Sequence, residues 1–281
     1  MGNVIITSDS TCDLSPELLE QHQIITLPLY INLNDHFYRD GVDITPDDIY
    51  ENYKKNKTIP KTSAIPPGDY LDFFAALHPG ENEIVHFSIS SGFSTTHQNA
   101  CMAAKELGHI HPIDSRNLST GIGLQVLYAS DMARNGASAQ EIVEKLADIT
   151  PKVDASFILD TLEYMCKGGR CSSATKLGAN LLRIKPCIEV KDGGMIVGKK
   201  YRGKLLSVFQ QYCDDRLRDV QVEPTRAFVT HSGLEDMTHA ETIRRQVLDT
   251  GLFKEVHITR AGCTVSTHCG INTLGVLFIH A

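Results

Sequence analysis

Three short segments rich in hydroxyl side chains lie far apart in the chain, each beside an apolar run. They cover residues 61–63, 88–96 and 264–270. If folding brings them together, they form a set of neutral hydrogen-bond donors with one titratable imidazole, His268. Such groups complement a carboxylate. The pattern therefore indicates a site for an anionic head group rather than for bond breaking.

The strongest local signal is the serine loop at residues 90–94. A predicted strand at 83–89 leads into this loop, and a predicted helix at 94–107 follows it. Loops at the carboxyl ends of parallel strands commonly hold ligands, and a helix N-terminus offers unpaired amides. Ser91 and Ser94 are therefore candidates for contacting the anion, although simple helix capping explains such serines equally well.

The other two segments support both a functional and a structural interpretation. Thr62 and Ser63 precede Pro66 and Pro67, so local capping alone would explain them. His268 lies in a predicted loop between glycines, before an apolar strand. A lone histidine is more often structural than functional, and both alternatives stay open at this point.

Several kinds of chemistry are absent from the sequence. No phosphate-binding loop of the Gly-x-x-x-x-Gly-Lys-Ser/Thr type and no Gly-x-Ser-x-Gly elbow occurs. Cys263, His268 and Cys269 lack the spacing of a zinc site, and the acidic turn at residues 9–13 has no matching cluster of acids. We therefore expect no catalytic residue, no metal and no cofactor.

The composition is that of an ordinary globular protein. The chain has 281 residues, 42% hydrophobic and 22% charged, and a formal net charge of −7. This charge argues against nucleic acid as the main partner. No apolar run approaches the roughly 20 residues of a membrane span. Eight cysteines without a Cys-x-x-Cys pair, and an N-terminus without a charged leader, predict reduced thiols and a cytoplasmic location.

The predicted elements divide the chain into two domains. Residues 1–152 alternate strands with helices, which predicts a parallel sheet with right-handed crossovers. One of the strands expected there covers residues 24–33. In residues 153–281, strands at 181–190 and 195–201 flank a turn and predict a β-hairpin. We expect an N-terminal parallel-sheet α/β domain, a C-terminal α+β domain with antiparallel strands, and a ligand pocket at their junction.

A series of short motifs resembles the DegV family of bacterial fatty-acid-binding proteins, the substrate-presenting subunits of a two-component fatty acid kinase. The resemblance covers nearly the whole chain. It rests on Asp9-Ser10-Thr11 with Asp13-Leu14, Leu27-Pro28-Leu29, Tyr38-Arg39-Asp40-Gly41, Lys61-Thr62-Ser63, Ser90-Ser91 with Ser94 and Thr96, Asp160-Thr161-Leu162-Glu163-Tyr164, Lys167-Gly168-Gly169-Arg170, Ile184-Lys185-Pro186, and Thr267-His268 with Gly270.

The resemblance implies that a long-chain fatty acid is buried between two domains. Thr62 and Ser94 would hold the carboxylate, with Ser91, Ser63 and His268 adjoining. The protein would do no chemistry alone and would present the carboxylate to a separate ATP-dependent kinase, while transient contact with a membrane is allowed. This chain departs from the family pattern at residues 94–96 and 268–272, where Ser-Thr-Thr replaces Ser-Gly-Thr and His-Cys-Gly-Ile-Asn replaces His-Thr-Gly-Pro-Gly.

Two basic residues and two alternative functions complete the sequence-based hypotheses. Arg170 and Arg202 are expected at the surface near the pocket mouth, as docking contacts for an acidic face of the kinase. The alternatives are an acyl hydrolase that pairs Ser91 or Ser94 with His268, and a sugar- or dihydroxyacetone-type binding subunit with a polar pocket.

Overall fold

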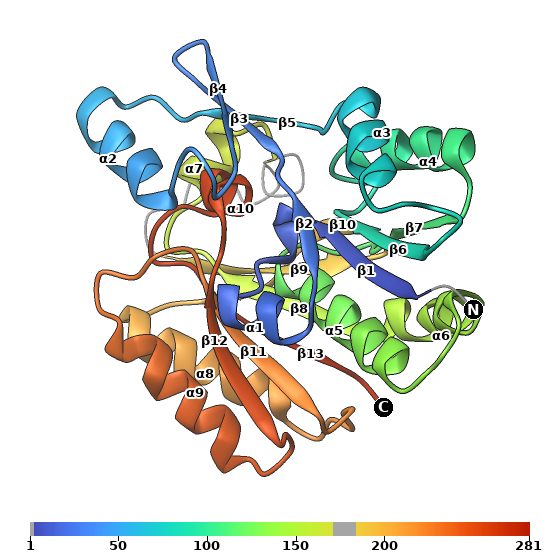
Figure 1. The fold of residues 1–281 in the computed structure, drawn as a ribbon. Helices are drawn as coiled ribbons and strands as arrows, with labels where there is room; N and C mark the ends of the chain where they lie inside the picture. The colour runs from blue at the N-terminus through green and yellow to red at the C-terminus, as the bar shows by residue number, and fades with distance from the viewer. Residues whose placement is uncertain (1–2, 171–183) are drawn as a thin grey trace.

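The computed structural model describes residues 3–170 and 184–281, which form a mixed α/β fold with three sheets (Figure 1). The first sheet is parallel and has the strand order β2-β1-β6-β7. Its strands are β1 (Val4–Asp9), β2 (Ile25–Leu27), β6 (Glu83–Ser88) and β7 (Ile110–Asp114). Helices follow these strands in sequence, as parallel pairing requires. They are α1 (Pro16–Gln21), α3 (Pro67–Ala75), α4 (Thr96–Leu107), α5 (Thr120–Arg134) and α6 (Ala139–Ile149).

The second sheet has six strands in the order β10-β9-β8-β13-β11-β12. All neighbours are antiparallel except β11 and β12, which are parallel. The strands are β8 (Val153–Ile158), β9 (Lys185–Lys191), β10 (Gly194–Tyr201), β11 (Arg226–His231), β12 (Glu255–Arg260) and β13 (Leu274–Ile279). The helices of this part are α7 (Glu163–Lys167), α8 (Leu205–Leu217), α9 (Thr238–Asp249) and α10 (Cys263–Cys269).

A small antiparallel sheet with the order β4-β3-β5 projects beside these two. It consists of β3 (Tyr30–Leu33), β4 (His36–Arg39) and β5 (Lys61–Ser63), and helix α2 (Pro46–Asn56) connects β4 to β5. The start of α2 is fixed by a capping box, in which the side chains of Thr45 and Asp48 bond to each other's backbone amides. The antiparallel pairing of β5 with β3 fixes the register of β5 in this sheet.

Helix α5 forms the centre of the molecule. Most of its residues are buried, and it contacts β1 and β6 of the first sheet as well as β8, β11 and β13 of the second. Close packing depends on glycine here, since a Cβ on Gly123 would lie 2.8 Å from the carbonyl oxygen of Cys12. The two large sheets therefore share one core around α5, and segments from both can meet at its N-terminal end.

The structure confirms the predicted fold class and corrects some details. The strand expected at 24–33 is two strands, because Pro28 has no amide hydrogen and the amide of Leu29 bonds to Ser10 Oγ instead of to a neighbouring strand. The predicted hairpin is present as β9 and β10, and residues 181–183 of its expected first strand lie outside the described residues. The sheet type changes at residue 153, where β8 begins. The division into domains 1–152 and 153–281 stays a prediction.

Two further observations concern cysteines and membranes. Among the cysteines that the structure describes, six are free thiols, whereas Cys166 is disulfide-bonded, which corrects the expectation that all eight are reduced. The free thiols are Cys12, Cys101, Cys187, Cys213, Cys263 and Cys269. Within the described part of the chain, no helix has the length and apolar character needed to cross a membrane.

Candidate ligand-binding site

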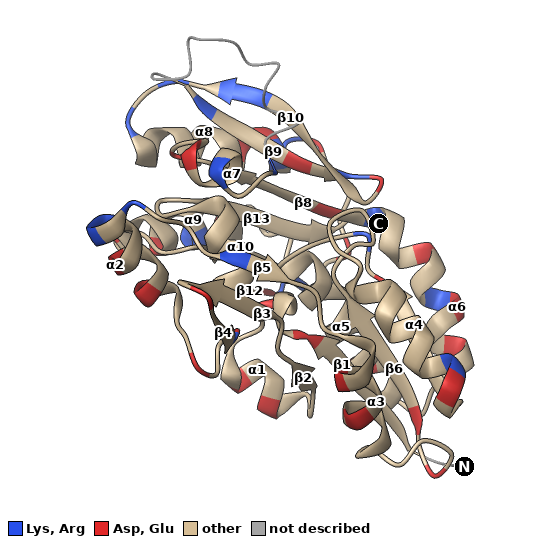
Figure 2. Cartoon of the chain, turned by 90° about the horizontal axis from the view of Figure 1, so that it is seen from above, with Lys and Arg blue, Asp and Glu red and all other residues tan. Residues whose placement is uncertain are grey.

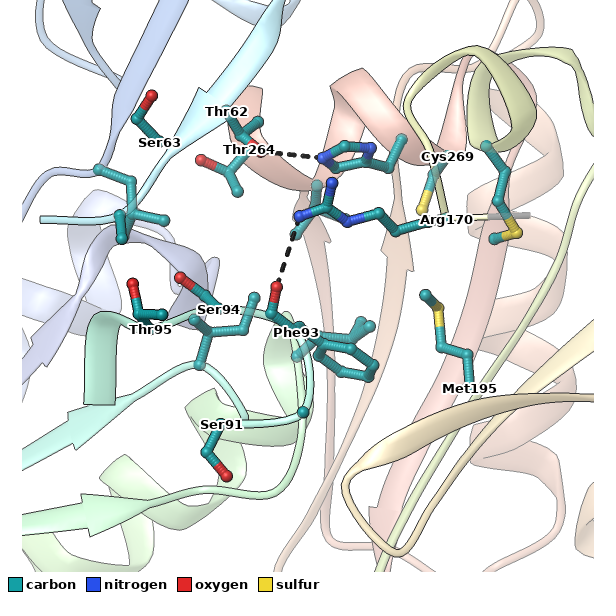
Figure 3. Close-up of a pocket in the computed structure, with 18 residues that line it drawn as sticks. Thr62, Ser63, Ser91, Phe93, Ser94, Thr95, Arg170, Met195, Thr264 and Cys269 are labelled. Carbon is teal, nitrogen blue, oxygen red and sulfur yellow. Dashed lines mark hydrogen bonds between the residues drawn. The ribbon is translucent and has the colours of Figure 1, made fainter. Parts of the chain in front are cut away.

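A cavity of about 450 Å³ lies where the serine loop, β5, α10 and the end of α7 meet (Figure 3). All five residues predicted to bind a head group line it: Thr62, Ser63, Ser91, Ser94 and His268. Lining residues come from both sides of residue 152. In Figure 3 the labelled hydroxyl side chains gather on one side of the cavity, while Met195 and Cys269 lie on the other. The cavity is therefore polar at one end and apolar at the other.

Thr62 and His268 are joined by a hydrogen bond across 206 residues of sequence, with 3.0 Å between Thr62 Oγ1 and His268 Nε2. The register of the small sheet places Thr62, since it pairs Thr62 with Ile31 of β3. His268 lies in the last turn of helix α10 and not in a loop, which corrects the sequence-based assignment. A helix fixes the direction of the imidazole more firmly than a loop would.

The imidazole of His268 is neutral at physiological pH. Burial, and secondarily the positive charge of Arg170, lower its pKa from 6.5 to about 4. Its Nδ1 atom is buried and has no hydrogen-bond partner among residues 3–170 and 184–281, and a Cβ on Gly168 would lie 2.4 Å from it. The backbone at Gly168 therefore packs directly against the ring. A neutral imidazole carries a single N–H, so only one ring nitrogen can donate.

The serine loop follows β6 and presents Ser94 at the cavity. Helix α4 begins at Thr96, two residues later than the sequence predicts, and Thr95 at its N-cap makes no side-chain cap. Ser94 Oγ instead accepts from the amide of Thr96 at 3.2 Å and lies 2.7 Å from Thr96 Oγ1. If the Thr96 hydroxyl donates to Ser94, the proton of Ser94 remains free to point into the cavity.

Ser91 and Ser63 differ in what their hydroxyls can do. Ser91 Oγ donates to Asp114 Oδ2 at 2.5 Å, and the Ser91 amide donates to Asp114 Oδ1 at 3.1 Å. The only hydroxyl proton of Ser91 is thus already directed away from a ligand. Ser63, next to Thr62 on β5, lines the cavity without a comparable carboxylate partner among the described residues.

The two arginines do not lie in equivalent places. Arg170 lines the cavity, where its guanidinium donates to the carbonyl oxygens of Gly168 at 3.2 Å and Phe93 at 3.4 Å. Arg202 is exposed between β10 and α8 and is not among the residues that line the cavity. Arg170 therefore contributes positive charge to the cavity wall itself, and its role as a docking contact stays a prediction.

Sequence reasoning missed two polar lining residues, Thr95 at the N-cap of α4 and Thr264. The side chain of Thr264 lies near Thr62 on the cavity wall, and its Oγ1 is buried with no partner in the described structure. The signal was present, because Thr264 opens the third hydroxyl-rich segment. Its position on the same face of α10 as His268, four residues away, could only be read once this segment was known to be helical.

The apolar end of the cavity continues inward. Leu118, Val265 and Cys269 line both the main cavity and a small inner cavity of about 20 Å³, so the two are neighbours separated by these side chains. Burial raises the pKa of the Cys269 thiol to about 12, which keeps it neutral. The inner wall therefore offers apolar contacts and no charge.

The arrangement suits binding better than catalysis. Among the described residues, His268 bonds to a threonine, while Ser91 and Ser94 bond to Asp114 and Thr96, so no serine–histidine pair is assembled. The described part of the chain also contains no group of three or more His, Cys, Asp or Glu side chains that could hold a metal ion.

Comparisons with known proteins agree with this geometry. A family model described as "Uncharacterised protein, DegV family" matches residues 3–281. A DegV domain-containing protein of Caldanaerobacter subterraneus subsp. tengcongensis is 30% identical over 285 residues, which cover 99% of each chain. The chain belongs to the DegV family.

Two solved structures share the fold over nearly their whole length. A fatty-acid-binding DegV family protein from Thermus thermophilus is 26% identical with a TM-score of 0.88, and the match covers 99% of this chain and 100% of the other. A stearic-acid-binding protein from Eubacterium ventriosum is 26% identical with a TM-score of 0.85, covering 100% of this chain and 98% of the other.

Proposed function

We propose that this protein binds a long-chain fatty acid, holds its carboxylate with Thr62 and Ser94, and presents it to a separate ATP-dependent fatty acid kinase. The observation that carries the proposal is the Thr62–His268 hydrogen bond at the polar end of a cavity that is also lined by apolar side chains such as Leu118, Val265 and Met195. The fatty-acid-binding relatives with the same fold support the class of ligand.

The neutral imidazole directs the hydroxyl proton of Thr62. If His268 Nε2 carries the ring proton, it donates to Thr62 Oγ1, and the Thr62 hydroxyl is free to donate to a carboxylate oxygen. In the other tautomer, Nδ1–H would be a buried donor with no partner among the described residues. The Thr62 hydroxyl would then donate to His268 Nε2 and not to the ligand. The Nε2–H form satisfies more groups once the ligand is bound. His268 then acts on the carboxylate through Thr62.

The rest of the cavity accounts for the acyl chain. Side chains such as Ile89, Leu118 and Met195 exclude water along the wall. Burial of each methylene stabilises the complex by about 0.8 kcal/mol, so most of the affinity comes from the tail and a few hydroxyls suffice to orient the head. Ser63 and Ser91 complete the polar wall, with Ser91 held in place by Asp114.

The kinase is proposed because the sequence contains no phosphate-binding loop of its own. A phosphoryl donor must then reach the carboxylate from outside. Lys199 and Lys200 lie at the end of β10, and Arg202 and Lys204 follow in the segment that leads to α8, where Figure 2 shows basic residues. A cationic surface there would suit docking of an acidic protein face. We place the protein in the cytoplasm, with transient membrane contact when it collects its ligand.

Two measurements test the proposal. Native mass spectrometry of the freshly purified protein should show a bound fatty acid, and its mass gives the chain length. Thr62→Ala and Ser94→Ala should each lower fatty-acid affinity roughly tenfold to a hundredfold, because a hydrogen bond to a charged group contributes about 1.5–3 kcal/mol. Thr242→Ala, on α9, is the matched control and should bind like wild type. Unchanged affinity in both cavity variants would remove these hydroxyls from the head-group site.

The two alternatives make different predictions. A hydrolase would turn over an acyl ester, whereas the engagement of His268 with Thr62 predicts no turnover. A sugar-type binding subunit would retain a polar ligand of low mass in the same native mass spectrum. Either result would replace the fatty-acid proposal.

A further inference from the structure

Helix α10 carries the head-group residues His268 and Thr264 but has no cap of its own. It spans only Cys263–Cys269, and its N-cap is Gly262, which has no side chain to accept from the first-turn amides. Unpaired amides at a buried helix start are costly, so their partners must come from elsewhere in the chain.

Two carboxylates from the other end of the sequence supply these partners. The Gly262 amide donates to Asp13 Oδ1 at 2.8 Å. The next two amides donate to the two oxygens of Asp40, from Cys263 at 2.7 Å and from Thr264 at 3.0 Å. Three consecutive amides are thus held by two acids that lie more than 220 residues earlier in the chain. These bonds satisfy amides that the helix itself leaves without partners at its first turn.

The carboxylates are themselves fixed in place. Asp40 is buried, and Ser10 Oγ donates to its Oδ2 at 3.3 Å while accepting from the amide of Leu29 at 3.1 Å. Leu29 is one of the cavity-lining residues. Asp13 is also buried and accepts from the hydroxyl of Ser119, which immediately precedes α5. Asp13 and Asp40 therefore connect α10 to the centre of the fold and to the cavity wall.

The fit leaves little space between the acids and the helix. A Cβ on Gly262 would lie 3.1 Å from Asp40 Oδ1 and 3.2 Å from Asp13 Oδ1, closer than most side chains tolerate. Since the two acids occupy the first-turn amides, the N-terminus of α10 is not free to bind an anion. A ligand carboxylate must be bound by side chains on the flank of the helix, and their positions depend on how the helix is held.

We infer that Asp13 and Asp40 are positioning residues for the head-group site, which fix α10 so that His268 Nε2 stays within hydrogen-bonding distance of Thr62. The inference rests on the proposed function and adds to it the source of the site's geometry. Neither acid touches the ligand, and both act through the helix.

The test compares an acid with a neutral ligand of equal tail length. Asp40→Asn keeps one acceptor oxygen and places an NH₂ group opposite an amide that needs an acceptor. Its affinity for palmitic acid should fall on the order of tenfold, the effect of one weakened hydrogen bond to a charged group. Its affinity for cetyl alcohol should stay within about twofold of wild type, because the tail contacts remain.

Asp154→Asn is the matched control. Asp154 is a partly buried acid, with a side chain 9% exposed, that binds Arg216 and His280 and does not line the cavity, so the same substitution should cost stability without changing the ratio of acid to alcohol affinity. An equal loss of both affinities in Asp40→Asn, or no loss, would overturn the inference. Thr62→Ala tests the proposed function separately. If Asp40→Asn behaves as the inference does not expect but Thr62→Ala still lowers the affinity for the acid, only the inference fails. If Thr62→Ala also leaves this affinity unchanged, the proposed function fails as well.

Discussion

Replacing His268 tests whether it acts on the ligand through Thr62. His268→Ala removes the donor 3.0 Å from Thr62 Oγ1, so the hydroxyl of Thr62 is no longer directed toward the carboxylate. We expect about a tenfold loss of fatty-acid affinity, or roughly 1.4 kcal/mol, which lies at the lower end for a hydrogen bond to a charged group. The loss should not vary between pH 6 and pH 8. The depressed pKa of about 4 keeps the imidazole neutral throughout this range.

Two isosteric variants separate the ring nitrogens. Glutamine has its Nε2 as many bonds from Cβ as histidine has, so His268→Gln should restore most of the affinity. Asparagine ends where Nδ1 lies and cannot reach Thr62, so His268→Asn should bind like His268→Ala. Affinities are measured by displacement of a fluorescent fatty acid, with melting temperatures as a control for folding.

A double-mutant cycle decides between a relayed and a direct contact. If His268 acts only through Thr62, His268→Ala should cost almost nothing in a Thr62→Ala background. A full tenfold loss in that background would mean that the imidazole contacts the carboxylate itself, and the relay would be refuted.

Three further outcomes are expected. Arg202→Glu should keep fatty-acid affinity and lower kinase-dependent phosphorylation. Arg170→Glu, on the cavity wall, should lower both the affinity and the phosphorylation. Phosphorylation of both variants at the wild-type rate, at low and at high salt, would refute the docking role. Burial raises the pKa of Asp13 in the native state to about 8. Between about pH 4 and 8, Asp13 therefore holds a proton in the native state that it has lost in the unfolded state. Its contribution to the free energy of unfolding falls as pH rises, by up to about 1.4 kcal/mol per pH unit. Buried histidines with lowered pKa values, such as His86 and His231, oppose this slope below about pH 6.5, so urea unfolding should show it between about pH 7 and 8, and its persistence in Asp13→Asn would assign it to other groups. Gly168→Ala should lower fatty-acid affinity, because the added Cβ displaces the adjacent imidazole of His268. Gly68→Ala is the control, since a Cβ there meets open space and should leave the affinity unchanged. Equal affinities of the two variants would contradict the close packing at Gly168.

Periodicity alone predicted most of the architecture, because strands and helices with one buried face repeat at two and 3.6 residues. It failed for α10, and the reasons are physical. The helix contains Thr264, Val265, Ser266 and Thr267, residue types with low helix propensity, and nearly all of it is buried, so no polar face marks its period. Its N-cap signal is absent because the caps lie in another part of the chain. No window of sequence around residue 263 could reveal them.

The same limit applies to the site. Hydroxyl-rich segments could be recognised one by one, but the contact between Thr62 and His268 joins positions 206 residues apart. Only the pairing of β5 with β3 and the seating of α10 bring them together. The resemblance to the DegV family had already predicted that Thr62 and His268 lie in the same site. It did not indicate that the proton of Ser91 is committed to Asp114, nor that Arg170 lies on the cavity wall.

The choice of neutral donors for the head group follows from the proposed role. A bidentate arginine would bind a carboxylate more tightly than hydroxyls do, but it would occupy both oxygens. In the proposed reaction the carboxylate attacks a phosphoryl group, so one oxygen has to remain available and nucleophilic. Under this proposal Thr62 and Ser94 orient the head group with single hydrogen bonds, while the guanidinium of Arg170 is engaged by the carbonyl oxygens of Gly168 and Phe93. Affinity then comes from the buried tail, which leaves the head group weakly held and open to reaction.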